Sequence, residues 1–324
     1  METLKKYANH RLVVFLYLFI LTILFYKVAN RVFDKKVHLG GDNAGYYIYG
    51  KSIAKGEGYV ALHDKAKPKA NHFPPGYPTL IAGVMKAFSG KITTVKAANG
   101  FFMLAALFVL FFLFRALTTN IHLSFVACLL ALHNFHLLQY STIMMSELSF
   151  VLFSAISLLL FVFTDFTKSV FKNWMFLLFV MVMVFAFYIR TMGISLFLSF
   201  TLILLIQKRW KYTAVLVGGF LLLVAPWQIR SHSLGGNSYV NQLFMINPYR
   251  PELGKMEAKN WPDRITMNVK RYLALEITSG ILPFETINYK LTQKQLKAEL
   301  SGEAPDNKDA NKPIDNKKPE DSKA

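Results

Sequence analysis

The sequence contains a single cysteine, Cys128, which lies within an apolar run. One cysteine excludes an intramolecular disulfide and a metal site of the CxxC type. Two histidines of the first polar loop, His63 and His72, follow no known metal-ligand spacing with Asp64. A Walker-type phosphate loop is also missing, because the glycines in 56–58 lack its spacing and the Lys-Ser/Thr pair that follows it. The residue pattern therefore predicts no metal site.

Acidic residues are scarce in this chain. It has 19 Asp and Glu residues against 37 Lys and Arg residues, a formal net charge of +18. A basic excess is typical of nucleic-acid-binding proteins. Here, however, the basic residues lie between apolar runs, where cytoplasmic loops and lipid headgroups account for them. The lipid bilayer is therefore the expected partner, and no nucleic-acid partner is expected.

Long polar stretches are few before residue 230, and 53% of the chain is hydrophobic. Apolar runs of this length predict an all-α polytopic membrane protein with about seven transmembrane helices. The run at 174–206 would form a helix of about 50 Å, too long for one crossing, so we expect two spans with a hinge at 190–193. The run at 77–88 is too short to cross and is expected at the interface. The expected spans are 12–30, 97–114, 123–138, 148–163, two within 174–206, and 212–227. The span at 123–138 is interrupted by His133, Asn134 and His136.

Basic residues are distributed unevenly over the short connections between these spans. Arg115, the pair Lys168 and Lys172, and the group at 208–211 fall in alternate connections. Because cytoplasmic loops carry the excess of Lys and Arg, these connections are expected inside. Counting back predicts a cytoplasmic N-terminus and a first long loop on the outer face.

The order of apolar and polar stretches also predicts the organisation of the whole chain. A transmembrane domain is expected over 1–232, with its large outer loop and short interfacial helices at 33–96. A polar outer segment with short helices is expected over 233–300. The tail at 301–324 is rich in Lys, Asp, Asn and Pro and has no aromatic residue, so it is expected to be disordered.

The longest polar interruption between the spans, 37–78, contains the first candidate for chemistry. Asp42 follows two glycines and precedes Tyr46, and the prolines within 74–78 fix the backbone where the chain returns to the membrane. A long polar loop between spans is more often functional than idle. Asp42 is therefore a candidate catalytic acid, with a turn residue as the alternative.

Three further ionisable residues are expected at the outer face: Glu147, Arg190 and Arg230. Ionisable side chains at membrane depth are costly unless they are paired or solvated, so each is a site candidate. Guanidinium groups suit a phosphate, and a nearby carboxylate suits a general base. The alternatives are that Glu147 caps a helix and that the arginines extend to lipid headgroups.

Several short motifs occur in a characteristic order. They are D-N-A-G-Y at 42–46, G-E-G-Y at 56–59, P-P-G-Y-P at 74–78, S-E at 146–147, R-T-M-G at 190–193 and P-W-Q-I-R at 226–230. In this order they resemble motifs of the integral-membrane GT-C glycosyltransferases. The resemblance is to the branch of the protein O-mannosyltransferases and the aminoarabinose lipid A transferases, and it extends over roughly 10–235.

The resemblance implies transfer of a sugar from a polyprenyl-phosphate-linked donor to a hydroxyl of a glycan, lipid or protein acceptor. It implies the cell (inner) membrane, with the active site on the outer face. The resemblance implies no definite cofactor, but a divalent cation is possible. The implied roles are Asp42 as catalytic acid/base, Arg190 and Arg230 as ligands of the donor phosphate, and Tyr46, Tyr77 and Glu147 as residues that shape the pocket.

Two other functions remain open at this point. The chain is short for this family, which favours an inactive relative that binds lipid or a partner enzyme as a scaffold. A lipid-headgroup transporter ranks last, because nothing resembles the paired broken helices of transporter repeats.

Overall fold

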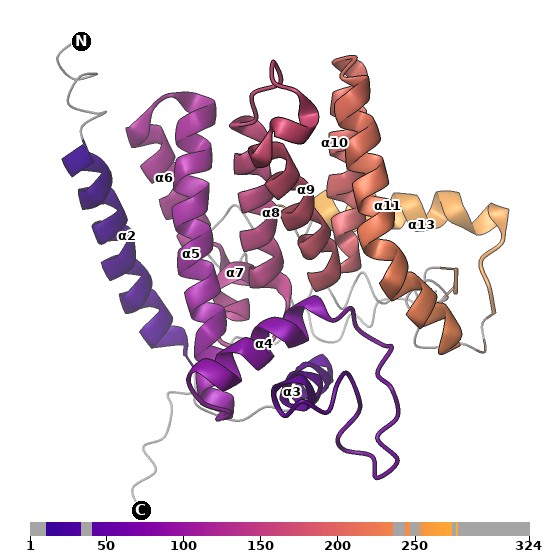
Figure 1. The fold of residues 1–324 in the computed structure, drawn as a ribbon. Coiled ribbons are helices and arrows are strands. Elements are labelled where there is room, and N and C mark those ends of the chain that lie inside the picture. The colour runs from indigo at the N-terminus through magenta and orange to yellow at the C-terminus, as the bar shows by residue number, and fades with distance from the viewer. Residues whose placement is uncertain are drawn as a thin grey trace, which may run out of the picture. The chain divides into compact units, whose positions relative to one another are not determined.

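The computed structural model describes residues 11–33, 41–235, 244–246, 252, 254–273 and 277. About 76% of these residues are helical and none forms a strand (Figure 1), which confirms the predicted all-α class. The chain divides into two units, Met1–Trp261 and Pro262–Ala324, which are described separately. The tail expected at 301–324 lies outside the described residues.

Among the described residues, three helices are long and apolar enough to cross a membrane: α2 (Arg11–Val32), α5 (Ile92–Thr118) and α11 (Trp210–Ser233). Four shorter apolar segments lie between them in the chain. These are α6 (Ile121–Leu132), α8 (Glu147–Val162), α9 (Trp174–Ile189), and the stretch Thr191–Ile206, which joins η2 (Thr191–Gly193) to α10 (Ile194–Ile206). The remaining helical segments are α3 (Asp42–Ala54), α4 (Gly76–Ala87), α7 (Phe135–Tyr140), η1 (Val170–Lys172), η4 (Ala258–Asn260) and α13 (Trp261–Arg271).

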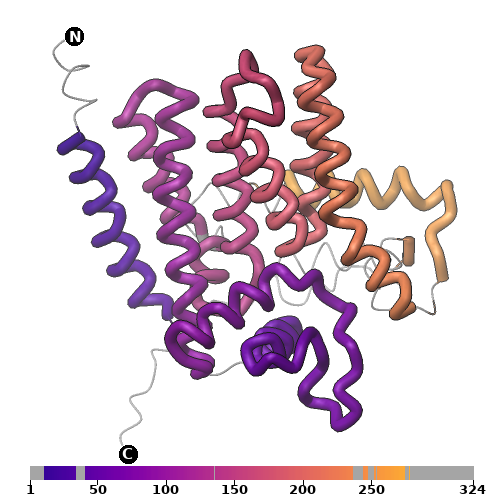
Figure 2. The backbone as a smooth tube through the Cα atoms, viewed as in Figure 1, coloured from indigo at the N-terminus to yellow at the C-terminus, as the bar shows by residue number. Residues whose placement is uncertain are grey.

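The apolar helices pack side by side in the first unit. Helix α5 packs against α6 and α8, α8 packs against α9, and α11 packs against both α9 and α10 (Figure 2). The short helices α3 and α4 pack on each other, and α4 also contacts α5 and α9. Through these contacts the first polar loop is anchored on the helices whose ends carry the other candidate residues.

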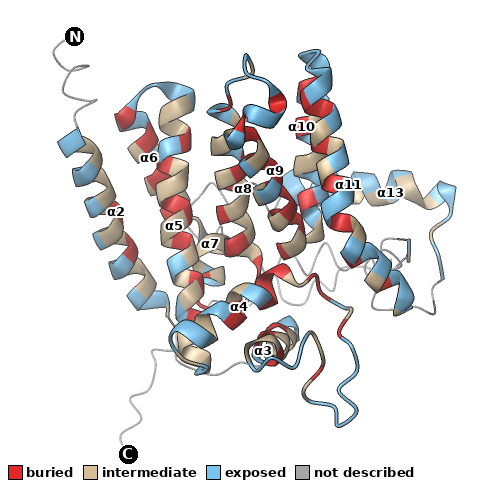
Figure 3. Cartoon of the chain, in the orientation of Figure 1, coloured by how far each residue is buried: buried red, intermediate tan, exposed pale blue. Residues whose placement is uncertain are grey.

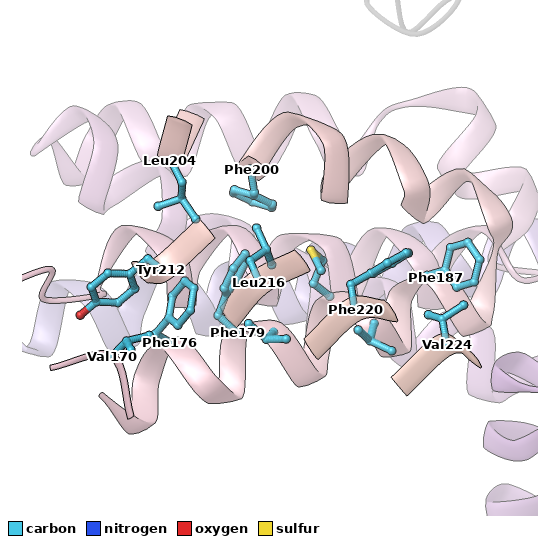
Figure 4. Packing of buried hydrophobic residues seen from close by; sticks show 13 residues of the cluster. Val170, Phe176, Phe179, Phe187, Phe200, Leu204, Tyr212, Leu216, Phe220 and Val224 are labelled. Carbon is cyan, nitrogen blue, oxygen red and sulfur yellow. The ribbon is translucent and has the colours of Figure 1, made fainter. Parts of the chain in front are cut away.

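The largest group of buried apolar side chains lies between α9, α10 and α11, and we call it the aromatic cluster (Figure 4). Its rings meet in tilted and edge-to-face pairs, such as Phe179 with Phe200 at 4.8 Å between ring centroids. Such geometries are favourable for aromatic pairs. The cluster consists of Val170, Phe176, Phe179, Val180, Met183, Val184, Phe187, Phe200, Leu204, Tyr212, Leu216, Phe220 and Val224.

Apolar side chains also cover much of the outer surface of the helices. On α2 only Leu21 and Phe25 are buried, whereas Phe15 is 67% exposed. On α11 Leu222 is 74% exposed, and Figure 3 shows exposed positions along both helices. Soluble monomers rarely expose continuous apolar surfaces of this kind. Lipid is the environment that suits them.

Two of the apolar runs are interrupted by breaks in the helix, at 190–193 and at Asn134. The predicted break at 190–193 is confirmed, because α9 ends at Ile189 and Arg190 has extended backbone angles. The span expected over 123–138, with its polar interruption at 133–136, is divided into two helices at that interruption. Helix α6 ends at Leu132, and the side chain of Asn134 accepts a hydrogen bond from the backbone N–H of Leu137, which starts α7. With 12 residues, α6 is about 18 Å long.

Candidate functional site

Six polar side chains from separate parts of the sequence meet where α3 and α4 pack on the bundle, and we call them the polar junction. They are linked through hydrogen bonds and one ion pair, and all lie in the first unit. The junction consists of Tyr46 on α3, Tyr77 on α4, Asn99 on α5, Ser146 and Glu147 at the start of α8, and Arg190 at the end of α9.

The centre of the junction is an ion pair between Glu147 and Arg190. The Arg190 Nη1 atom lies 2.7 Å from Glu147 Oε1, with side-chain exposures of 33% for Arg190 and 19% for Glu147. Glu147 is the first residue of α8, where the helix dipole favours a negative charge. Glu147 thus stands in the first turn of α8, and the contact of its carboxylate that the structure shows is the pair with Arg190. The other carboxylate oxygen, Oε2, is buried and has no hydrogen-bond partner among the described residues.

Ser146 connects this ion pair to the first loop. Arg190 Nη1 donates a hydrogen bond to Ser146 Oγ at 3.0 Å, and the Tyr46 hydroxyl lies 3.2 Å from the same Oγ atom. The Tyr46 ring packs against Phe73 at 4.3 Å and against Tyr77 at 4.9 Å between centroids. The hydroxyl of Tyr46 is thus held in place by its ring, and α3 is fixed to the ends of α8 and α9.

Tyr77 and Asn99 form the buried side of the junction. The Tyr77 hydroxyl donates to Asn99 Oδ1 at 2.9 Å, and the Asn99 amide donates to the Met145 carbonyl at 2.9 Å. Burial raises the pKa of Tyr77 well above its ordinary value, against a smaller opposing effect of its bond to Asn99. Tyr77 therefore stays a neutral donor that orients Asn99, and Asn99 fixes the turn that leads into Ser146.

Asp42 is the first residue of α3, and its side chain is exposed. The preceding Gly41 has φ 58°, a backbone conformation that glycine adopts without strain. Asp42 and Tyr46 are four residues apart on one helix, so they share a face. Within the described part of the chain the Asp42 carboxylate has no ion pair or hydrogen bond. The structure therefore places Asp42 one turn from the junction, with its carboxylate accessible.

Arg230 on α11 has a different environment. Its Nη1 atom donates to the Ala70 carbonyl at 2.9 Å, and its Nη2 atom donates to the Tyr59 carbonyl at 3.4 Å. The guanidinium also lies over the Trp227 ring at 5.0 Å. These contacts bind the first loop to α11. Arg230 and Arg190 therefore make separate sets of contacts, Arg230 with the first loop and Arg190 with the start of α8.

Aromatic rings connect Arg230 to the junction. The guanidinium of Arg230 lies 5.6 Å from the centroid of the Tyr59 ring. Tyr59 packs against Tyr49 at 5.2 Å, Tyr49 against Phe73 at 6.1 Å, and Phe73 against Tyr46. Burial raises the pKa of Tyr49, so this hydroxyl is also neutral at neutral pH. A continuous row of aromatic side chains of the first loop therefore extends from Arg230 to Tyr46, whose hydroxyl contacts Ser146.

Two buried polar residues of the site were missed by sequence reasoning. Asn99 is 0% exposed, and Lys96 is 3% exposed with its ammonium 5.5 Å from the centroid of the Phe33 ring. Both lie in the first turns of α5, three residues apart. The signal was present, because polar side chains inside an apolar run are costly unless they have a role. For Lys96 it was lost because the expected span at 97–114 began after this residue, whereas Asn99 lay inside that span and was not singled out.

The fold and the site define an all-helical protein with apolar helices of membrane length and a polar junction at their ends. Among the described residues no group of three or more His, Cys, Asp or Glu side chains is arranged to hold a metal ion. Comparisons with protein-family models, with curated proteins and with solved structures gave no match to this chain.

Proposed function

We propose that this protein is a membrane glycosyltransferase that transfers a sugar from a polyprenyl-phosphate-linked donor to an acceptor hydroxyl. In this proposal the apolar segments form seven spans of the cell membrane, and the N-terminus is cytoplasmic. The first loop and the polar junction then lie on the outer face, as the distribution of basic residues predicts. The order of the motifs from Asp42 to Arg230 supports the same assignment.

The observation that carries the proposal is the state of Arg190. Its Nη1 atom is held by Glu147 and Ser146, while no described residue accepts a hydrogen bond from its Nη2 or Nε atoms. An arginine has five N–H donors and binds phosphate through two parallel bonds. Arg190 is thus held in a fixed orientation with donors left for a phosphate, and its side chain is 33% exposed.

The proposed reaction uses Asp42 and Arg190 in complementary roles. The Asp42 carboxylate takes the proton of the acceptor hydroxyl, whose oxygen attacks the anomeric carbon of the donor. The bond from that carbon to the phosphate oxygen breaks, and Arg190 stabilises the negative charge of the departing lipid phosphate. Tyr46 and Tyr77 hold the helices that carry these groups. Arg230 fixes the first loop on α11 and is the second candidate for the donor phosphate.

The test is complementation of a deletion strain, with mass spectrometry of surface glycans and lipid-linked sugars. We expect Asp42→Asn to lower transfer by about 10²–10⁴-fold, because a general base is lost while the shape is kept. The matched control is Asp64→Asn in the same loop. The Asp64 Oδ1 atom accepts a hydrogen bond from the Ala66 N–H at 2.8 Å, which asparagine can also accept. Restoration of the glycan by Asp42→Asn to the level of Asp64→Asn would refute the role of Asp42.

One observation favours a second function, a lipid-binding or partner-binding scaffold without turnover. Both arginines already have partners within the chain, because Arg190 pairs with Glu147 and Arg230 binds two loop carbonyls. A scaffold would copurify with a larger transferase and show no transfer by itself. Transfer by the purified protein in defined lipid, dependent on Asp42, would exclude this second function.

A further inference from the structure

Helix α13 (Trp261–Arg271) separates its apolar and polar side chains onto two faces. At 100° per residue, Trp261, Ile265 and Val269 fall within an arc of about 80°, and Tyr272 continues the same stripe. The opposite side carries polar and charged residues, with Met267 the exception. These are Asp263, Arg264, Thr266, Lys270 and Arg271.

Beyond Trp261, whose ring packs against Phe244 at 6.3 Å between centroids, the apolar stripe of α13 is largely exposed in the described part of the chain. Ile265 is 57% exposed, Val269 is 50% exposed and Tyr272 is 56% exposed. The helix has 11 residues, about 16 Å, so it is too short to cross a bilayer. A short helix with low overall hydrophobicity and one apolar face is suited to lie along a surface and not to span it.

The polar face of α13 indicates which surface this is. It has three basic residues and one acid, so it carries a net positive charge. Trp261 stands at the start of the helix, and tryptophan is enriched at membrane interfaces. Basic residues on one face and aromatic or aliphatic residues on the other are typical of helices that bind anionic lipid. The described part of the same chain has three helices of membrane length, so a bilayer is the surface that fits this helix best.

We infer that α13 lies in the plane of a membrane surface that contains anionic headgroups. Ile265 and Val269 then enter the boundary between headgroups and acyl chains, to a depth of about 5–10 Å. Lys270 and Arg271 remain at the level of the headgroup phosphates. This inference is independent of the proposed transferase activity, because no residue of the polar junction takes part in it.

The test measures the depth of single spin labels on the full-length protein in lipid nanodiscs. Cys128 is replaced by alanine, and one nitroxide is attached at Ile265→Cys or at Met267→Cys. These positions lie on opposite sides of α13, about 160° apart. In nanodiscs of phosphatidylcholine with phosphatidylglycerol, we expect the label at 265 to collide more with oxygen than with a water-soluble nickel chelate. The label at 267 should show the reverse.

The lipid charge is tested with the same labels. In nanodiscs of phosphatidylcholine alone, or with Lys270→Glu and Arg271→Glu together, we expect the label at 265 to become more accessible to the nickel chelate. Equal nickel access at 265 and 267 in both lipids would place the helix in water and overturn the inference. Protection of position 265 from both reagents would assign its apolar face to a protein contact. Insertion that does not depend on lipid charge would refute the role of the anionic headgroups.

Discussion

The aromatic cluster and the polar junction are held together by different forces. In the aromatic cluster, the side chains of Phe176, Phe179 and Phe200 meet through ring contacts. In the junction, Glu147 and Arg190 make an ion pair whose geometry is directional. Between apolar helices in lipid the hydrophobic effect contributes little, so packing determines stability. The cluster therefore sets the stability of the bundle, while the junction fixes the position of the groups that could act on a ligand.

The largest expected effect is in the aromatic cluster, at Phe179→Ala. Phe179 is 0% exposed and contacts Phe161, Phe176 and Phe200. Its truncation leaves a cavity, so we expect a loss of about 3–5 kcal/mol in the free energy of unfolding. Unfolding in mixed micelles of mild detergent and dodecyl sulfate would measure this.

The matched control for Phe179 is its neighbour on α9, Leu178, which is 38% exposed. Leu178→Ala removes contacts with detergent or lipid more than contacts with protein, so the loss should stay below about 1 kcal/mol. Equal losses for the two substitutions would mean that packing in the cluster is not what stabilises the bundle.

The second prediction concerns Gly76, where the first loop meets α9. A Cβ atom at this glycine would lie 2.5 Å from the Tyr188 carbonyl carbon and 2.6 Å from the Ile189 nitrogen, directly before Arg190. Gly76→Ala must push α4 away from this backbone, and such overpacking typically costs about 1–3 kcal/mol. The measurements are the free energy of unfolding in mixed micelles and the rate of the proposed sugar transfer. We expect both values to fall because Arg190 is displaced.

Gly83 on the same helix provides the control. A Cβ atom at Gly83 meets nothing within 4 Å. Gly83→Ala should therefore stabilise α4 by up to about 1 kcal/mol, because alanine loses less backbone freedom in a helix than glycine. If Gly76→Ala behaves like Gly83→Ala, then the close packing of α4 on α9 does not position Arg190.

The two regions also differ in how far the sequence predicts them. The helices and the break at 190–193 follow from apolar runs and from the residues that interrupt them, which are local signals. The ion pair between Glu147 and Arg190 could not be predicted, although each residue had been singled out. The two residues are far apart in the sequence: Ser146, which precedes Glu147, is 44 positions from Arg190. Which distant residues meet depends on how α4, α8 and α9 pack. The polar residues at 133–136 indicated an interruption of the span at 123–138, but not that Asn134 would cap a separate helix, α7.

The smallest expected effect is the coupling between Glu147 and Arg190, measured by a double-mutant cycle. Variants are Glu147→Gln, Arg190→Gln and both together, unfolded in the same micelles. We expect a coupling of roughly 1 kcal/mol, because both side chains are partly buried and the pair also includes Ser146. The loss in Glu147→Gln alone should exceed this coupling, since it leaves the Arg190 charge without its carboxylate partner.

The exposed pair of Lys168 and Asp165 is the reference for this cycle. Its atoms lie 3.8 Å apart, with side-chain exposures of 62% and 46%, so its coupling should be near zero and screened by salt.

A phosphate-bearing donor lipid distinguishes the two pairs further. If Arg190 binds the phosphate through its free donors, donor lipid should stabilise the wild type and not Arg190→Gln, while Lys168→Gln responds like the wild type. Equal stabilisation of Arg190→Gln would assign the phosphate to another group and leave the ion pair a purely structural role.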